Sequence, residues 1–147
     1  MKKHQEIIKA QNEFKVRRES YLKLNHEFFL NFTNQLYKKA ELPNNGMIKY
    51  KYGTDDNSNI VEDWLEIDDN GNCAMRISVI ANDIRHDFWL SNSKDGDTLK
   101  LEISNGNEAK KFAYDLTIQK NVAQIEFESE IDFIIDSAII LYDRWRF

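Results

Sequence analysis

The chain contains 147 residues, of which 41% are hydrophobic, and it carries a formal net charge of −5. This length is close to the commonest domain size and suffices for one hydrophobic core, so we expect a single domain over residues 1–147. The single cysteine, Cys73, excludes an internal disulfide and a cysteine-based zinc site, and no apolar run reaches the roughly 18 residues of a membrane span.

A long helix is predicted over residues 1–42, because this stretch contains no glycine or proline. Its first half carries a thin apolar stripe, in which Ile7, Phe14 and Tyr21 are spaced by seven residues. We therefore expect the early turns to project from the body or to pack on another chain. The second half is amphipathic, with large apolar residues at intervals of three or four, at Tyr21, Leu24, Phe28, Phe32 and Leu36.

From residue 47 to residue 127 the apolar residues alternate as they do in β-strands. The alternating runs are separated by hairpin-type turns such as Asn82-Asp83 and Asn105-Gly106. These signals predict an antiparallel meander of five to seven strands. The strand candidates are 47–53, 60–67, 73–81, 84–90, 98–104, 111–118 and 122–127.

A second helix is predicted over residues 129–146. Ser129 is a suitable N-cap with Asp132 three residues later, and an apolar face follows along the helix. The expected fold class is therefore α+β. A long N-terminal helix, an antiparallel five- to seven-stranded meander and a C-terminal helix follow one another, with both helices on one face of the sheet.

Turn chemistry also predicts how the strands align, because a slip of one residue would exchange the two faces of a strand. A two-residue turn at Asn82-Asp83 places Ile77 opposite Phe88. A three-residue loop in the preceding hairpin places Ile67 opposite Cys73.

Charge matching predicts the alignment of the next pair of strands. Asp87 opposite Lys100 makes a favourable cross-strand pair, and the same alignment brings Phe88 opposite Leu99. The charge and hydrophobic patterns thus favour one alignment.

On this alignment Trp64, Arg76 and Trp89 form a cross-strand row on the sheet face away from the helices. A guanidinium between two indoles is a favourable cation–π arrangement, and both residue types are enriched in binding hot spots. The row forms either a small second core or a binding surface. We take it as the candidate binding site, with an acidic rim made of Glu62, Glu66 and Asp87.

The apolar face also carries Asp63 and His86, which could line a pocket between the sheet and the helices. A carboxylate near an imidazole can orient it as a general base, although a structural role in the core explains the pair as well. No nucleophile motif, glycine-rich phosphate loop or metal-ligand spacing accompanies these residues. We therefore predict no cofactor and no metal, and we favour a non-catalytic protein over an enzyme.

Charge is unevenly distributed along the chain. Residues 1–40 contain nine Lys and Arg against four Glu, a net charge of +5, whereas residues 41–147 contain eleven basic and twenty-one acidic residues, a net charge of −10. An acidic body disfavours binding to nucleic acid phosphates and suits a basic protein partner. The opposite charges of the two segments also favour self-association through the N-terminal helix.

These observations predict a small, acidic, cytoplasmic protein that acts by binding another protein, as an inhibitor, an immunity factor or a chaperone-like adaptor. Its size, acidity and mixed α/β pattern are similar to those of small bacterial secretion chaperones and toxin-immunity proteins, without a motif specific to either. The alternative is a small-molecule-binding protein or hydrolase-like enzyme with a pocket that includes Asp63 and His86. A nucleic-acid mimic or binder is the second alternative.

Overall fold

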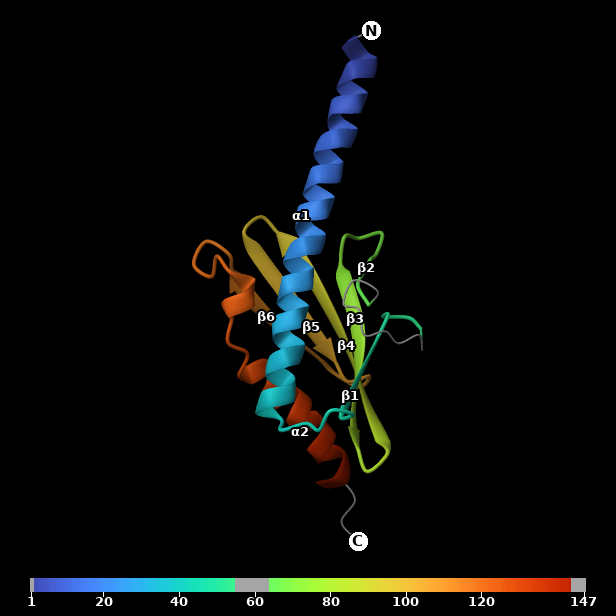
Figure 1. Cartoon of the computed structure of the whole chain (residues 1–147), viewed down its shortest axis with the longest axis vertical. Helices are drawn as coiled ribbons and strands as arrows, with labels where there is room; N and C mark the ends of the chain where they lie inside the picture. The colour runs from blue at the N-terminus through green and yellow to red at the C-terminus, as the bar shows by residue number, and fades with distance from the viewer. Residues whose placement is uncertain (1, 55–63, 144–147) are drawn as a thin grey trace.

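The computed structural model describes residues 2–54 and 64–143. Its helices are α1 (Lys2–Lys39), the short 3-10 helix η2 (Val122–Gln124) and α2 (Ser129–Asp143). Its strands are β1 (Met47–Tyr50), β2 (Glu66–Ile67), β3 (Cys73–Ala81), β4 (Ile84–Asp95), β5 (Thr98–Ser104) and β6 (Ala109–Asp115). The predicted α+β class is confirmed, because a six-stranded antiparallel sheet lies between a long N-terminal and a C-terminal helix in the chain (Figure 1).

The sheet has the strand order β1-β3-β4-β5-β6, and β2 pairs with the same edge of β3 as β1 does. Both helices lie on one face, which we call the inner face. Helix α1 contacts it where Asn92 donates a side-chain hydrogen bond to Asn25 at 2.9 Å. Helix α2 contacts it where Tyr114 donates a hydrogen bond to Glu130 at 2.6 Å. The opposite face of the sheet, which neither helix covers, is called the outer face.

The hydrophobic core lies between the inner face and the two helices. The aromatic contacts of the core centre on Phe28 of α1. The centroid of its ring lies 5.1 Å from that of Phe127 and 5.4 Å from that of Tyr114, and both contacts are edge-on. Strand alternation predicted correctly which sheet residues are buried on this face. They are Met75, Ile77, Phe88, Leu90, Leu99, Leu101 and Ile103.

Two predicted hairpin alignments are confirmed. Ile77 pairs with Phe88 across the Asn82-Asp83 turn, whose two residues have the positive φ angles of a type I′ turn. Ile67 pairs with Cys73 across the preceding loop. Both alignments depend on turn residues that are adjacent in the sequence to the strands they join.

The predicted alignment of β4 with β5 is wrong by six residues. Lys100 pairs with Ser93 rather than with Asp87. Strand β4 continues beyond its predicted end to Asp95, which pairs with Thr98 across a two-residue turn. A displacement by an even number of residues keeps each side chain on its predicted face, so the core was predicted correctly despite the error.

A buried polar residue explains why the sequence predicted β4 to be too short. Asn92 interrupts the apolar alternation, yet it is fully buried on the inner face. Its side-chain amide can be buried there because it donates a hydrogen bond to Asn25 of α1. A consequence is that pairing with β5 starts at Trp89, and the residues of β4 before Trp89 have no partner in β5.

The position on β3 that was predicted for strand 60–67 is mostly occupied by β1. Strand β1 pairs with β3 so that Tyr50 lies opposite Arg76. Among the described residues of the predicted strand, 64–67, the last two form β2, and residues 60–63 lie outside the described part of the chain.

The predicted strand 122–127 is not a strand. It consists of η2 and an irregular segment that is held by polar side chains of α1. Asn31 donates to the main-chain oxygen of Val122 at 3.0 Å, and Gln35 accepts from the main-chain N–H of Phe127 at 2.9 Å. Side chains of the helix thus satisfy main-chain groups that a neighbouring strand would otherwise satisfy.

Helix α1 contacts the body along half of its length. We call residues 21–39 the packed half, because its buried side chains lie on the inner face. Residues 2–20, the projecting half, are all exposed, and they extend beyond the end of the sheet (Figure 1).

Candidate functional site

The predicted row on the outer face is only partly formed. Arg76 and Trp89 are cross-strand partners, but Tyr50 rather than Trp64 lies on the other side of Arg76. The guanidinium carbon of Arg76 is 4.3 Å from the centroid of the Tyr50 ring, and that of Arg85 is 5.2 Å from it. The outer-face row is therefore Tyr50, Arg76 and Trp89.

Trp64 belongs to the core, so its predicted place in the row is wrong. It lies in a turn before β2 and is 1% exposed. The Nζ atom of Lys49 lies 4.4 Å from the centroid of its ring. Lys49 pairs with the inner-face residue Ile77, and burial lowers the pKa of its ammonium group. Trp64 is thus buried beside the helix-covered face of the sheet.

The three acidic residues predicted around the row have different surroundings. Glu66 is exposed on β2, and Glu62 lies outside the described residues. Asp87 accepts a hydrogen bond from Ser78, and its Oδ1 atom lies 3.7 Å from Nη2 of Arg85. The binding role of the outer-face row stays a prediction.

Strand β4 has an open edge, which the predicted alignment concealed. The segment Ile84–Phe88 pairs with β3 on one side. On its other side no strand of the described chain pairs with it, because β5 joins at Trp89. The β3–β4 hairpin therefore extends past the rest of the sheet (Figure 1).

The direction of the main-chain groups along this edge follows from a neighbouring hydrogen bond. Ile80 of β3 donates its N–H to the oxygen of Gly46 at 2.9 Å, on the side away from β4. Its cross-strand partner Arg85 is therefore in a non-hydrogen-bonded pair, and directs its N–H and C=O toward the open edge. Asp87, two residues further along, has the same orientation.

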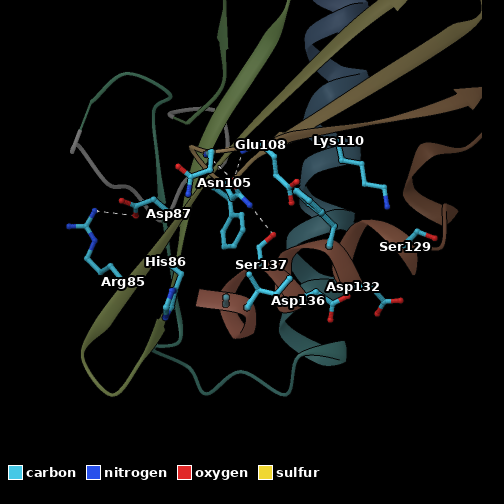
Figure 2. A pocket seen from close by; sticks show the side chains of 15 residues that line it. Arg85, His86, Asp87, Asn105, Glu108, Lys110, Ser129, Asp132, Asp136 and Ser137 are labelled. Atoms are coloured by element: carbon cyan, nitrogen blue, oxygen red, sulfur yellow. Dashed lines mark hydrogen bonds and ion pairs between the residues drawn. The ribbon is translucent and has the colours of Figure 1, made fainter. Parts of the chain in front are cut away.

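A groove of about 710 Å³ lies beside the open edge. It is bounded by β4, by the turn between β5 and β6 and by α2, and Figure 2 shows its side chains. The turn is tied to α2, because Asn105 donates to Ser137 at 3.2 Å. Asn105 also accepts from the main-chain N–H groups of Asn107 and Glu108, at 2.9 and 2.8 Å. This wall of the groove is thus held in place from both sides.

The groove combines apolar surface with an excess of acidic side chains. Its apolar part includes Phe88, Phe133 and Ile140. Three carboxylates, Glu108, Asp132 and Asp136, line it together with the cationic side chain of Lys110, whereas Asp87 and Arg85 border it with their main chain and direct their side chains to the outer face, where Asp87 contacts Ser78. Positive charge on a ligand is therefore favoured here.

His86 lines the same groove, but its described surroundings contain no catalytic partner. Its Nε2 atom lies 3.1 Å from the hydroxyl of Tyr142, and the two rings are edge-on with centroids 5.7 Å apart. Asp63, the predicted carboxylate partner, lies outside the described residues. Within the described chain, the hydrogen bond of the His86 ring is to a tyrosine hydroxyl, which orients the ring against α2.

Within the described part of the chain, the other reactive groups give no second site. Cys73 is buried on the inner face, and burial raises the pKa of its thiol to about 12. Among residues 2–54 and 64–143, no cluster of His, Cys, Asp and Glu is placed to hold a metal ion. No helix in the described part of the chain has the length and hydrophobicity to span a membrane.

Sequence reasoning placed Asp87 and His86 in two separate candidate sites, and the structure brings the main chain of Asp87 and the side chain of His86 to one groove, while the Asp87 carboxylate stays on the outer face. The open edge itself was missed because it depends on where β5 starts to pair. No protein-family model matches the chain, and comparisons with curated proteins and with solved structures also give no match.

Proposed function

We propose that this protein is a non-catalytic binding protein that receives an extended, basic segment of a partner protein along the edge of β4. The observation that carries the proposal is the open edge beside an acidic groove. Addition of a strand to an exposed sheet edge is a general mode of peptide recognition, in which main-chain hydrogen bonds supply affinity and flanking pockets supply specificity.

The edge offers a defined set of main-chain contacts. Arg85 and Asp87 present two N–H and two C=O groups toward the open side. Ile84–Phe88 spans about 17 Å as a strand, which accommodates a peptide of about five residues. The wall formed by the β5–β6 turn limits the groove at Trp89, so the added strand would lie beyond the end of β5.

Side chains around the edge favour a particular kind of segment. Alternate residues of an added strand would point toward α2, where Phe133 and Ile140 offer apolar contacts. Asp132 and Asp136 lie on the same helix, and Glu108 lies on the opposite wall. Lysine or arginine at alternate positions would meet these carboxylates, which would steer the partner and lose influence as salt is added.

Substitution at Asp87 tests the main-chain contribution. The Asp87→Pro variant removes both the carboxylate and the edge N–H, whereas Asp87→Ala removes the carboxylate alone. Proline is tolerated at an edge whose N–H faces away from the neighbouring strand, so both variants should fold. The probe is a panel of ten-residue peptides with Lys or Arg at alternate positions, measured by fluorescence anisotropy.

We expect Asp87→Pro to bind the best peptide about tenfold more weakly than Asp87→Ala, the size of one or two lost hydrogen bonds. Equal affinities for the two variants would contradict strand addition. The same panel with Glu in place of Lys and Arg should not bind, and binding of that panel would contradict the charge argument.

A second pair of variants tests the acidic groove. Asp132→Lys with Asp136→Lys should abolish the salt-dependent part of peptide binding. Asp69→Lys with Asp95→Lys makes the same change in net charge in the β2–β3 and β4–β5 turns, at the opposite end of the sheet, and should leave peptide binding unchanged. An equal loss in both would show that overall charge, rather than the groove, attracts the peptides.

A further inference from the structure

The projecting half of α1 exposes large apolar side chains that nothing in the described chain covers. Ile7 is 56% exposed and Phe14 is 60% exposed. Isolated helices of this length are marginal in water, because helix nucleation is costly and most helical stability in proteins comes from packing. This half of the helix therefore presents a surface that is suited to a partner.

The exposed stripe is continuous with the stripe that packs on the sheet. Ile7, Phe14, Tyr21 and Phe28 are spaced by seven residues, and successive positions at this spacing drift by only about 20° around a helix. Tyr21 donates a hydrogen bond to the main-chain oxygen of Asn92, and Phe28 is fully buried against the inner face. Ile7 and Phe14 thus lie on the side of α1 that faces the sheet lower down the helix.

Two hairpin turns lie beside α1 where the helix leaves the body. A groove of about 640 Å³ separates them from the helix, and it is lined by Tyr21 and Leu24 on one side and by Gly71 and Gly96 on the other. The turns are acidic. They carry Asp68, Asp69, Asp95 and Asp97, all exposed, with Lys94 as the basic residue among them.

We propose that the projecting halves of two copies of this chain pair in antiparallel fashion, stripe against stripe, so that the start of each helix meets the acidic turns of the other copy. This pairing is independent of the β4 edge. Residues 2–20 span about 27 Å of helix, so in an antiparallel pair Lys2 and Lys3 of one copy lie next to the turns of the other.

The end of the sheet determines the alignment of the pair. In the pair, each helix packs on the side of the other copy's α1 where that copy's sheet also lies. Each helix therefore points at the end of the other copy's sheet, and this end limits how far the two helices can overlap. With Lys2 at that end, near Ser20 of the second copy, Ile7 lies opposite Phe14 of that copy.

A parallel arrangement is disfavoured by the position of the sheets. Each sheet lies on the stripe side of its own α1, as the contact of Tyr21 with Asn92 shows. Parallel helices that met along this stripe would bring both sheets into the same space. In the antiparallel pair the two bodies lie at opposite ends, and Ala10, a small residue, lies near the two-fold axis where the helices approach most closely.

Sedimentation velocity of the full chain at several concentrations tests the pairing. We expect a dimer that dissociates on dilution. Ile7→Ser should raise the dimer dissociation constant at least about a hundredfold, because each dimer loses two buried side chains. Ile8→Ser is the matched control, since Ile8 is an exposed isoleucine that lies about 100° from the stripe, and its effect should be less than about threefold. A monomer at all concentrations, or equal effects of the two variants, would overturn the proposal.

Distance measurements between spin labels test the orientation. The buried, high-pKa thiol of Cys73 does not compete for labelling at neutral pH, so a label attaches to an introduced exposed cysteine. In an antiparallel pair, labels at Asn12→Cys are offset by about 5 Å along the axis, and labels at His4→Cys by about 20 Å. Short distances at both positions would indicate a parallel pair and would overturn the proposal.

Charge reversal tests the contact between the helix start and the turns. Lys2→Glu with Lys3→Glu, and separately Asp95→Lys with Asp97→Lys, should each weaken the dimer at low salt. A mixture of the two double variants restores opposite charges at both ends of the pair, so it should associate as strongly as the unmodified chain. A mixture that associates no better than either variant alone would overturn this part of the proposal.

Discussion

The two halves of α1 have related apolar spacing but opposite surroundings. In the packed half Phe28, Phe32 and Leu36 are fully buried, whereas in the projecting half Ile7 and Phe14 are more than half exposed. The packed half is stabilised by its contacts with the sheet. The projecting half depends on its continuity with the packed half and, by our inference, on a second copy. A sequence pattern thus identifies a helix face, but not what covers it.

The largest difference between the halves is expected for phenylalanine truncation. Phe28→Ala should lower the free energy of unfolding by about 3–5 kcal/mol, because it leaves a cavity in the aromatic cluster. Phe14→Ala, measured in an Ile7→Ser background to prevent pairing, should change it by less than about 0.5 kcal/mol. Urea unfolding followed by circular dichroism measures both. Similar losses would mean that the projecting half packs on its own body, which would break the comparison.

The boundary between the halves can be tested at Asn25. Its side chain accepts from Asn92 at 2.9 Å and donates to the main-chain oxygen of Tyr21 at 2.8 Å. Asn25→Ala leaves the buried amide of Asn92 without this partner and should lower the free energy of unfolding by about 1–3 kcal/mol. Asn12→Ala, the same change in the projecting half, should have no destabilising effect, since alanine is the better helix former. A destabilising Asn12→Ala would move the boundary toward the start of the helix.

The end of the packed half carries a small local strain. Glu41 has a φ of 53°, and the N–H of Leu42 bonds to the oxygen of Tyr37 at 3.0 Å, as in a Schellman motif. Because a glycine adopts this conformation without penalty, Glu41→Gly should raise the free energy of unfolding by about 1 kcal/mol. Glu41→Ala should give no such gain. Thermal unfolding of the two variants measures the difference, and equal stabilities would show that this helix end is unstrained.

The smallest free energies are expected for local opening of the projecting half. In the Ile7→Ser variant, its main-chain amides should exchange with solvent after openings that cost about 1 kcal/mol or less. Amides of the packed half should exchange only at costs that approach global unfolding. Hydrogen exchange measured by NMR resolves both. Strong protection of residues 6–20 in a monomeric sample would show that the helix is stable without a partner.

The sequence was sufficient for features that depend on neighbouring residues. The Asn82-Asp83 turn predicted the pairing of Ile77 with Phe88, since a type I′ turn restricts how two strands can align. Alternation predicted the inner face, because successive side chains of a strand point to opposite sides. The apolar stripes of the two helical segments predicted both helices, and they predicted that both pack on the inner face.

The remaining features were decided by contacts between distant parts of the chain. The length of β4 depends on Asn92, whose burial is possible because Asn25 of α1 accepts its hydrogen bond. The length of β4 determines how it aligns with β5, and this alignment leaves the edge of β4 open at Asp87. Charge matching had instead paired Asp87 with Lys100. Trp64 is buried because β1 takes the place on β3 that its own segment was predicted to occupy. Local patterns specify faces and turns, whereas the candidate site depends on which of several compatible alignments allows the buried amide of Asn92 to donate to Asn25.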